Sequence, residues 1–164
     1  MTKSIPDGFH TITPSIIVSD AAKAIDFYKK AFGAQESERF VTPDGKAVMH
    51  AQLKIGNSML MLGSEFPPSC LSPKSRGGTT VSLYLYVENA DATFDRAVKA
   101  GCTVKMPMMD QFWGDRFGQV EDPFGHQWSF ATHKQDLTPD QIAANAKIFF
   151  ANMAKKCAPE MVTA

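Results

Sequence analysis

The chain has 164 residues, 44% of them hydrophobic, and its 17 basic and 17 acidic side chains cancel. This length suits one compact domain, or two small half-domains fused around one core. Because no run of like charge gives a footprint for nucleic acid or an anionic membrane, we expect neither as a partner, and a small neutral ligand or a protein instead.

The termini and the cysteines point to a cytoplasmic protein. No apolar stretch approaches the roughly 18 residues of a membrane span, and the N-terminus has no apolar signal core. Cys70, Cys102 and Cys157 are odd in number and form no CxxC pair, which indicates free thiols in a reducing compartment.

The first half of the chain predicts a strand, a helix and a three-stranded meander. Residues 12–18 are largely β-branched and predict the first strand, after which Ser19 or Asp20 caps a helix that ends at Gly33. Three further strands are expected at residues 38–41, 48–55 and 59–63.

The second half repeats this order after a linker rich in Pro, Gly and Ser at about residues 66–78. We expect a strand at 81–87, a helix capped near Asn89 and ended by Gly101, a short strand at 103–106, a loop at 107–114, and a hairpin of strands 117–121 and 127–132. Val18 to Gly33 spans fifteen positions and Val87 to Gly101 fourteen, which indicates two copies of a βαβββ unit in an α+β fold.

A C-terminal helix is expected at about residues 138–156, following module one at about 10–65 and module two at about 79–133 within one domain. Thr138 and Gln141 form a capping box with Pro139 at the first helical position. The apolar face of this helix consists of Ile142, Ala146, Phe149, Phe150 and Met153. This face either packs over the helix's own sheet or forms a dimer contact.

The sequence from Ile17 to Gly33, with Phe27, Tyr28 and Phe32, and the downstream segments 113–116 (Trp-Gly-Asp-Arg) and 122–126 (Asp-Pro-Phe-Gly-His) resemble the vicinal oxygen chelate superfamily. That superfamily includes glyoxalase I, fosfomycin-resistance enzymes, bleomycin-resistance proteins and extradiol dioxygenases. The resemblance covers about residues 10–133 and is closest to the PhnB-like branch. It implies two paired modules whose sheets close into a cup.

The resemblance also implies where a metal would lie, since metalloenzymes of the superfamily hold a divalent ion with up to four inward side chains, usually His and Glu. Matching by motif places Thr13, Met61, Ser82 and Ser129 at those positions. Hydroxyls and a thioether provide no charge and weak donation. We therefore expect no metal and no cofactor.

Strand alternation predicts a cup lined by aromatic, thioether and neutral polar groups. The ligand-binding residues expected are Thr13, Ser15, His50, Gln52, Met59, Met61, Ser82, Tyr84, Tyr86, Trp113, Phe117, Gln119, Gln127 and Ser129. Alternatively, Tyr84 and Tyr86 are half-buried sheet tyrosines. The loop carrying Met106, Met108, Met109, Phe112 and Trp113 is either a lid over the ligand or a small satellite core.

His50 is the candidate catalytic residue, because it is the imidazole that alternation places mid-strand on the cup side. His133 shares this parity but falls past the expected strand end, and His126 points away. Asp115 and Arg116 either orient a ligand or pair with each other.

Three functions remain open at this point. The leading hypothesis is a metal-free small-molecule-binding protein that resembles the bleomycin-resistance proteins and forms a homodimer. The alternative is a divalent-metal-dependent glyoxalase or dioxygenase-type enzyme with displaced ligands, His50 first and Glu121 second. A third is a metal-independent enzyme that uses His50 or Tyr84 as acid or base, so whether the protein is an enzyme stays undecided.

Overall fold

A computed structural model describes residues 2–157 and contains two βαβββ modules. Module one consists of β1 (Ser15–Val18), α1 (Ala21–Phe32), β2 (Gln35–Val41), β3 (Val48–Ile55) and β4 (Ser58–Ser64). Module two consists of β5 (Ser82–Tyr86), α3 (Ala90–Ala100), β6 (Thr103–Asp110), β7 (Asp115–Glu121) and β8 (Gln127–His133). The predicted duplication and the α+β class are confirmed.

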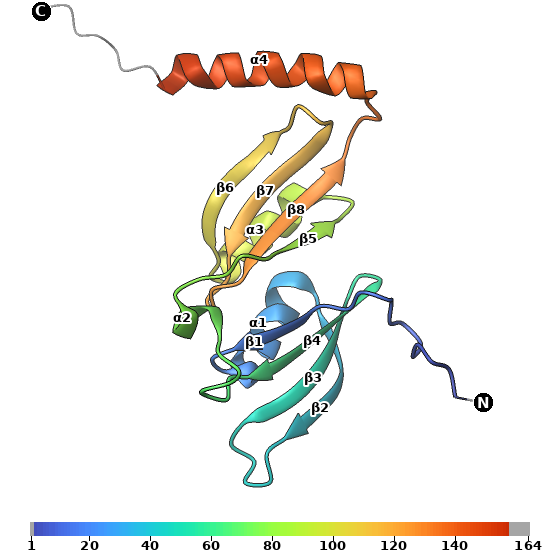
Figure 1. Ribbon diagram of the computed structural model, residues 1–164, viewed down its shortest axis with the longest axis vertical. Coiled ribbons are helices and arrows are strands. Elements are labelled where there is room, and N and C mark those ends of the chain that lie inside the picture. The colour runs from blue at the N-terminus through green and yellow to red at the C-terminus, as the bar shows by residue number, and fades with distance from the viewer. Residues whose placement is uncertain (1, 158–164) are drawn as a thin grey trace, which may run out of the picture.

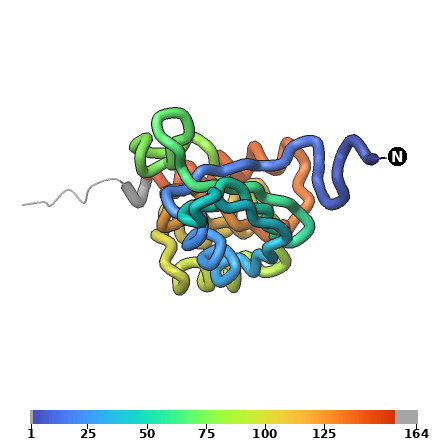
Figure 2. Tube along the Cα trace, turned by 90° about the horizontal axis from the view of Figure 1, so that it is seen from below, coloured from blue at the N-terminus to red at the C-terminus, as the bar shows by residue number. Residues whose placement is uncertain are grey.

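The two sheets have the same strand order, β1-β4-β3-β2 and β5-β8-β7-β6. In each sheet the first strand pairs in parallel with the last, and the remaining pairs are antiparallel. The sheets lie one beyond the other along the long axis with α1 and α3 behind them (Figure 1). The segment before β1 extends away from the body of the molecule (Figure 2).

Both module helices begin and end as the sequence predicts. Asp20 accepts a 3.1 Å hydrogen bond from the Lys23 amide, and the helix ends at Gly33 with a φ of 69°. Asn89 caps α3 through a 2.9 Å bond from the Ala92 amide. These caps satisfy amides that a helix start leaves without a partner, and they fix where the chain enters each helix.

The core is shared between the modules, because α1 packs against module two as well as its own sheet. The Phe32 ring lies 4.4 Å from Trp128 on β8, measured between centroids, and Tyr28 lies 5.3 Å from the same ring. Trp128, Tyr28 and Phe130 are among the largest fully buried side chains. This contact holds the two modules together by their helix sides and leaves their opposite faces available.

The prediction of a loop at residues 107–114 is wrong, because β6 continues to Asp110. The proline at position 107 suggested a break, yet β6 is the edge strand of its sheet, where a missing amide donor is tolerated. Met106, Met108 and Met109 therefore belong to a strand rather than a lid. The linker also differs from expectation, since it contains a short helix, α2 (Pro73–Arg76).

Several strand boundaries also differ from the prediction. Strand β2 begins at Gln35 rather than at residue 38, and β7 begins at Asp115 rather than at residue 117. The first strand begins at Ser15 rather than at residue 12, so Thr13 precedes it, and its hydroxyl donates to the His10 carbonyl at 3.0 Å. At the other end of the chain, β8 includes His133.

The suggested pair of Asp115 with Arg116 is wrong, since neighbours on a strand point to opposite faces. Arg116 instead pairs with Asp91 on α3 at 2.7 Å and with Asp110 at 3.5 Å.

Helix α4 (Pro139–Cys157) crosses the far end of module two (Figure 1). The predicted capping box is present, with Thr138 and Gln141 exchanging hydrogen bonds of 2.8 and 3.3 Å. The helix packs on the Phe112 ring through Phe149 and Phe150, and the Asn145 amide donates to the Phe112 carbonyl at 3.4 Å. It thus contacts a turn at the sheet end rather than covering the sheet.

The structure also bears on the predictions for the cysteines and for membrane-spanning segments. Cys70 is exposed and Cys102 is buried, and both are free thiols, whereas the Cys157 side chain lies outside the described part. Within residues 2–157, none of the helices has both the length and the hydropathy needed to cross a membrane.

Candidate functional site

Each sheet has one face packed against the helices and one open face. On β5, Leu83 and Leu85 pack against the core, whereas Tyr84 and Tyr86 alternate with them and are 44% and 66% exposed. On β3, Leu53 is fully buried and its neighbours on either side are not. The two open faces carry the residues that alternation assigned to the cup.

The open face of module two carries a row of aromatic rings that crosses the sheet and reaches α4. This aromatic row consists of Tyr86, Tyr84, Phe117, Trp113 and Phe112. Successive ring centroids are 5.0, 5.5, 5.8 and 4.9 Å apart, and the Phe112 ring is 5.6 Å from Phe149 of α4. These spacings lie in the range of favourable aromatic pairs, so the rings position one another.

A buried carboxylate lies at the end of this row. Asp115 is 3% exposed and accepts hydrogen bonds from the Tyr86 hydroxyl at 3.0 Å and the Trp113 indole at 3.1 Å, both at Oδ2. Its Oδ1 lies 2.8 Å from Nδ1 of His133, whose Nε2 lies 3.0 Å from Asp136. The bonds to Asp115 and Asp136 raise the pKa of His133. We call Asp115, His133 and Asp136 the Asp115 cluster.

Sequence reasoning missed this cluster because it placed Asp115 in a loop and His133 beyond a strand. The β7–β8 register pairs these two residues directly, which puts both side chains on the open face. A hairpin register counted back from the turn at residues 122–125 would have found the pair.

A second cluster, polar and neutral, lies further along the same face. The hydroxyls of Ser82 and Ser129 are 2.8 Å apart, and the Gln119 amide donates to them at 3.3 and 3.2 Å. Ser129 is 2% exposed, so its buried hydroxyl is satisfied by Ser82 and Gln119, whereas Ser82 is exposed.

A groove of about 770 Å³ separates the modules along β1 and β5. Its walls include Ile17, Val81 and Leu83, with Ser15, Arg76 and His126. His126 is otherwise buried and its Nε2 lies 2.9 Å from the Ile17 carbonyl, so it links β1 to module two rather than facing the cup. The edges of β1 and β5 that border the groove pair with no other strand among the described residues.

Comparison with known proteins identifies the family. The sequence model of the Glyoxalase/Bleomycin resistance protein/Dioxygenase superfamily matches residues 8–130. The chain belongs to this superfamily. An uncharacterised protein of Mycobacterium bovis is 46% identical over 137 residues, covering 81% of this chain and 90% of that protein.

Solved structures agree with this assignment. The TioX protein of Micromonospora sp. ML1 has a TM-score of 0.61 at 28% identity, covering 76% of this chain and 98% of the TioX chain. A PhnB protein of Bacillus cereus, described as a putative 3-demethylubiquinone-9 3-methyltransferase, has a TM-score of 0.58 at 18% identity and covers 75% and 99% of the two chains. The PhnB likeness concerns the fold alone.

The side chains at the superfamily's metal positions do not fit a divalent ion in this chain. Ser82 and Ser129 are hydrogen-bonded to each other and to Gln119. Met61 on β4 lies opposite Ser15 on β1 in the parallel pair of strands. Thr13 precedes β1. Within residues 2–157, no three His, Cys, Asp or Glu side chains lie close enough together to share a metal ion. Such ions need charged or imidazole donors, which these hydroxyl, amide and thioether groups cannot replace.

The displaced-ligand hypothesis also lacks a donor set in the described part of the chain. His50 stacks on Phe40 with centroids 6.3 Å apart, and its Nε2 is 3.5 Å from the Gln52 amide, which also donates to Glu38. Glu121 is on the other sheet and pairs with Lys105 at 3.2 Å. The structure therefore does not bring His50 and Glu121 together with a third ligand.

Tyr84 is poorly suited to act as a base at neutral pH. Burial, followed by the hydrogen bond with Tyr86, raises the pKa of the Tyr84 phenol well above its usual value. The phenol thus keeps its proton and can donate a hydrogen bond to a ligand.

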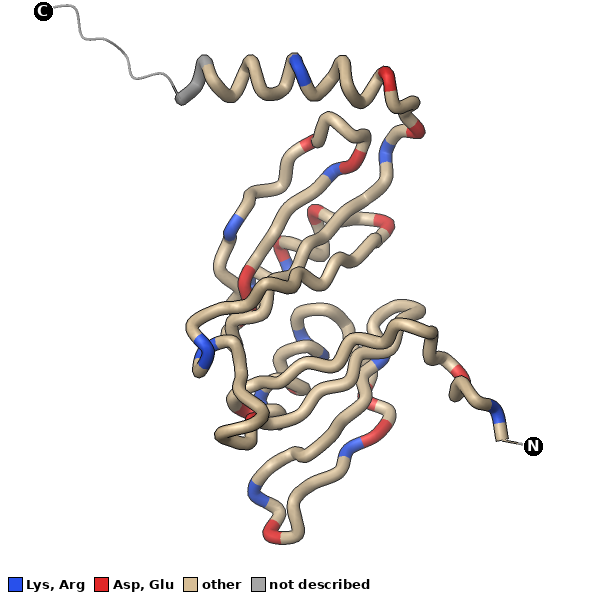
Figure 3. Tube along the Cα trace, viewed as in Figure 1, with Lys and Arg blue, Asp and Glu red and all other residues tan. Residues whose placement is uncertain are grey.

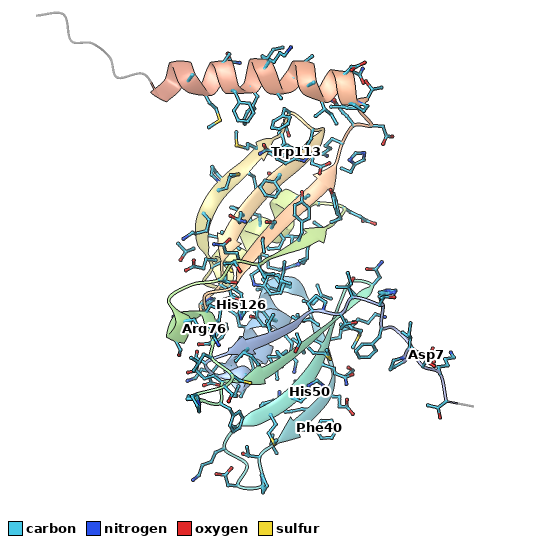
Figure 4. The ribbon with its side chains drawn as sticks, in the orientation of Figure 1. Asp7, Phe40, His50, Arg76, Trp113 and His126 are labelled. Carbon is cyan, nitrogen blue, oxygen red and sulfur yellow. The ribbon has the colours of Figure 1, made fainter. Side chains whose placement is uncertain are left out.

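The predicted ligand-binding residues form two groups on two sheets. Cross-strand pairing places Ser15, Met61 and Gln52 in one row of module one, next to His50 and Met59. Ser82, Tyr84, Tyr86, Phe117, Gln119, Gln127 and Ser129 share the open face of module two, and Trp113 lies at its α4 end. Figure 4 shows His50 and Phe40 on one sheet and Trp113 at the far end of the other.

Proposed function

We propose that this protein binds a small organic ligand without a metal ion, on the open faces of its two sheets, and that it does so as a homodimer. The aromatic row is the observation that carries the proposal. It presents closely spaced rings, of which Tyr84 and Tyr86 are exposed, bordered by the neutral Ser82, Ser129 and Gln119 cluster. Such surfaces bind organic molecules by stacking and a few directed hydrogen bonds.

The chemistry at the superfamily's metal positions supports the metal-free part of the proposal. A divalent ion held there would have to replace its water with neutral hydroxyls and a thioether, which do not compensate for its charge. The ligand-binding residues are those on the two open faces, including Thr13, Ser15, His50, Gln52, Met59 and Met61 in module one. We assign no catalytic role to His50.

The dimer is supported by the surfaces that one chain leaves uncovered. Members of the superfamily bind small ligands and often form dimers. Here the edges of β1 and β5, which pair with no further strand in residues 2–157, border the apolar groove, and Val81 in its wall is 61% exposed. A second copy would cover these edges and bring the open face of module one against that of module two of its partner.

The metal-free claim is tested by elemental analysis of protein purified without a histidine tag, together with binding of the neutral fluorescent aromatic N-phenyl-1-naphthylamine. We expect saturable binding that a chelator leaves unchanged, and binding that weakens in Tyr84→Ala. Ile148→Ala, an exposed apolar change on α4, is the matched control. A stoichiometric metal whose removal abolishes binding would contradict the proposal.

The dimer is tested by light scattering coupled to size-exclusion chromatography. The native chain should elute with twice its 18.0 kDa mass. Val81→Glu places a charge in the groove and should shift the protein to the monomer. A native protein that stays monomeric at all concentrations tested would contradict the dimer, and the ligand would then bind to a single chain.

A further inference from the structure

We propose that the aromatic row is a site for an organic cation, namely a molecule that joins an aromatic ring to a protonated or quaternary ammonium group. This inference rests on the proposed function, since it names the ligand class of the same open face. It concerns module two and α4, and requires no residue of module one.

The rings supply the first part of the argument. Tyr84 and Tyr86 are substantially exposed, so they are accessible to a ligand. The Phe117 ring stacks on the Tyr84 ring with centroids 5.5 Å apart and holds it in place. The face of an aromatic ring carries negative potential, which attracts an ammonium group placed over it. A ligand that has an aromatic ring but no positive charge would still stack on these rings, but it would lack this electrostatic attraction.

Asp115 strengthens the negative potential of two of the rings. The Tyr86 hydroxyl and the Trp113 indole both donate to Oδ2 of this carboxylate. A donor bonded to an anion is polarised toward it, so its ring becomes richer in electrons. Because Asp115 is 3% exposed, solvent screens its charge poorly, and the field reaches the ring faces.

The surroundings of Asp115 keep the site negative. His133 lies between Asp115 and Asp136, so the cluster carries one net negative charge with a protonated imidazole and two with a neutral one. The nearby Arg116 is already paired with Asp91 and Asp110. Acidic segments surround the junction of module two with α4, with short basic stretches among them (Figure 3). The overall neutrality of the chain therefore does not exclude a buried negative charge at this end of module two.

The same arrangement excludes other ligands at this position. Both oxygens of Asp115 are engaged by three donors, and no group of three possible metal ligands includes it within the described residues. An anionic ligand would meet the Asp115 cluster, and the nearby Arg116 is already engaged by two carboxylates. A cation with an aromatic part matches both the rings and the charge.

The test compares two molecules of nearly equal shape, phenyltrimethylammonium and tert-butylbenzene, binding to the full-length protein. Binding is followed by the shift of the Trp113 indole resonance in NMR spectra. We expect the cation to bind about two- to fivefold more tightly, as cation–π contacts at exposed rings predict. Raising the salt concentration should reduce this preference and leave the neutral compound unaffected.

Three variants locate the effect. Tyr84→Leu should weaken both compounds, because it removes a ring of the row. Asp115→Asn should reduce the preference for the cation, and Tyr86→Phe, which keeps the ring and removes its link to Asp115, should do so even if Asp115→Asn fails to fold. Asp44→Asn, which removes an exposed carboxylate in the β2–β3 turn, is the matched control and should change neither affinity.

The outcomes separate the two proposals. Equal affinities for the two compounds, both lost in Tyr84→Leu, would overturn the cation inference and leave ligand binding intact. Cation binding that persists in Tyr84→Leu would place it elsewhere and would overturn the inference as well. If neither compound binds at any concentration up to solubility, both proposals fail.

Discussion

The Tyr28 hydroxyl donates a 2.7 Å hydrogen bond to Asp122, which lies 94 positions further along the chain in the other module. Asp122 is 3% exposed and also accepts the Trp128 indole at 2.8 Å and the amides of Phe124 and His126 at 2.8 and 2.9 Å. One buried carboxylate therefore joins α1 to the β7–β8 turn, and it fixes how module one sits against module two.

Asp122→Asn should lower the free energy of unfolding by about 2–4 kcal/mol, because an amide nitrogen would replace an oxygen that accepts buried donors. Tyr28→Phe removes one of the donors and should cost about 1–2 kcal/mol. Both changes are measured by urea denaturation followed by tryptophan fluorescence.

Tyr84→Phe is the control for these changes, since it removes a hydroxyl from an exposed sheet tyrosine. We expect its stability to stay within about 0.5 kcal/mol of the native value. If Tyr28→Phe were equally harmless, the bond to Asp122 would not stabilise the contact between the modules.

Cys102 should resist thiol reagents in the folded protein. Burial, with a smaller contribution from Asp122, raises the pKa of this thiol to about 12, and the side chain is 7% exposed. Because the thiolate is the reactive form, modification requires the protein to open. In Cys70→Ser/Cys157→Ser, the rate with Ellman's reagent should therefore follow global unfolding.

That rate should increase when Asp122→Asn is added to the double variant, because the destabilised protein opens more often. In urea above the unfolding midpoint the reaction should be complete at once. Rapid labelling under native conditions would show that the region between α3 and β6 opens locally without unfolding.

His133 should make stability depend on pH. Its bonds to Asp115 and Asp136 raise its pKa in the folded state, so the folded protein holds the proton more tightly than the unfolded chain. The stabilising effect is fully present below the unfolded pKa of about 6.5 and is lost as the pH rises through the folded value. The stability difference between the native protein and His133→Gln should therefore be larger at about pH 6 than at about pH 9.

NMR titration of the His133 ring protons checks the cause of this effect. Asp136→Asn should bring the midpoint closer to that of an unperturbed histidine, because one of the two carboxylates is gone. An unchanged midpoint in Asp136→Asn would assign the shift to Asp115 alone. A stability difference that is the same at both pH values would refute the linkage.

Alternation along the strands accounts for most of what could be predicted. It placed Leu83 and Leu85 toward the helices and Tyr84 and Tyr86 on the open face, because residues two apart on a strand share a side. Glycines at the helix ends and the Asp20 cap set the repeat of the βαβββ unit. These features are local, so they can be recognised from neighbouring residues.

The features that could not be predicted depend on contacts between distant segments. Pro107 suggested a loop because a sequence does not reveal that β6 is an edge strand. Asp115 and His133 become neighbours through the register of β7 with β8, and the Tyr28 bond to Asp122 requires the two modules to pack by their helix sides. A pattern within one element carries none of this information.

Gly114 should be the most sensitive glycine near the aromatic row. Its φ is +100°, and an added Cβ would lie 2.5 Å from the Gln135 carbonyl oxygen. Its own carbonyl accepts the amides of Lys134 and Gln135 at 3.0 and 3.1 Å, so the turn at 111–114 and the segment leading to α4 are locked together. Gly114→Ala must push these backbones apart, since the nearest contact of the added Cβ is a backbone carbonyl and not a flexible side chain.

Gly33→Ala is the matched control, because Gly33 also has a positive φ, of 69°, but nothing lies within 4 Å of an added Cβ. We expect this change to cost about 1–2 kcal/mol from backbone strain alone. Gly114→Ala should cost about 1–3 kcal/mol more, from the added overlap, and should shift the Trp113 indole resonance. Equal costs for the two changes would mean that the turn can move away from residues 134–135, and that the Asp115 cluster does not depend on their contact.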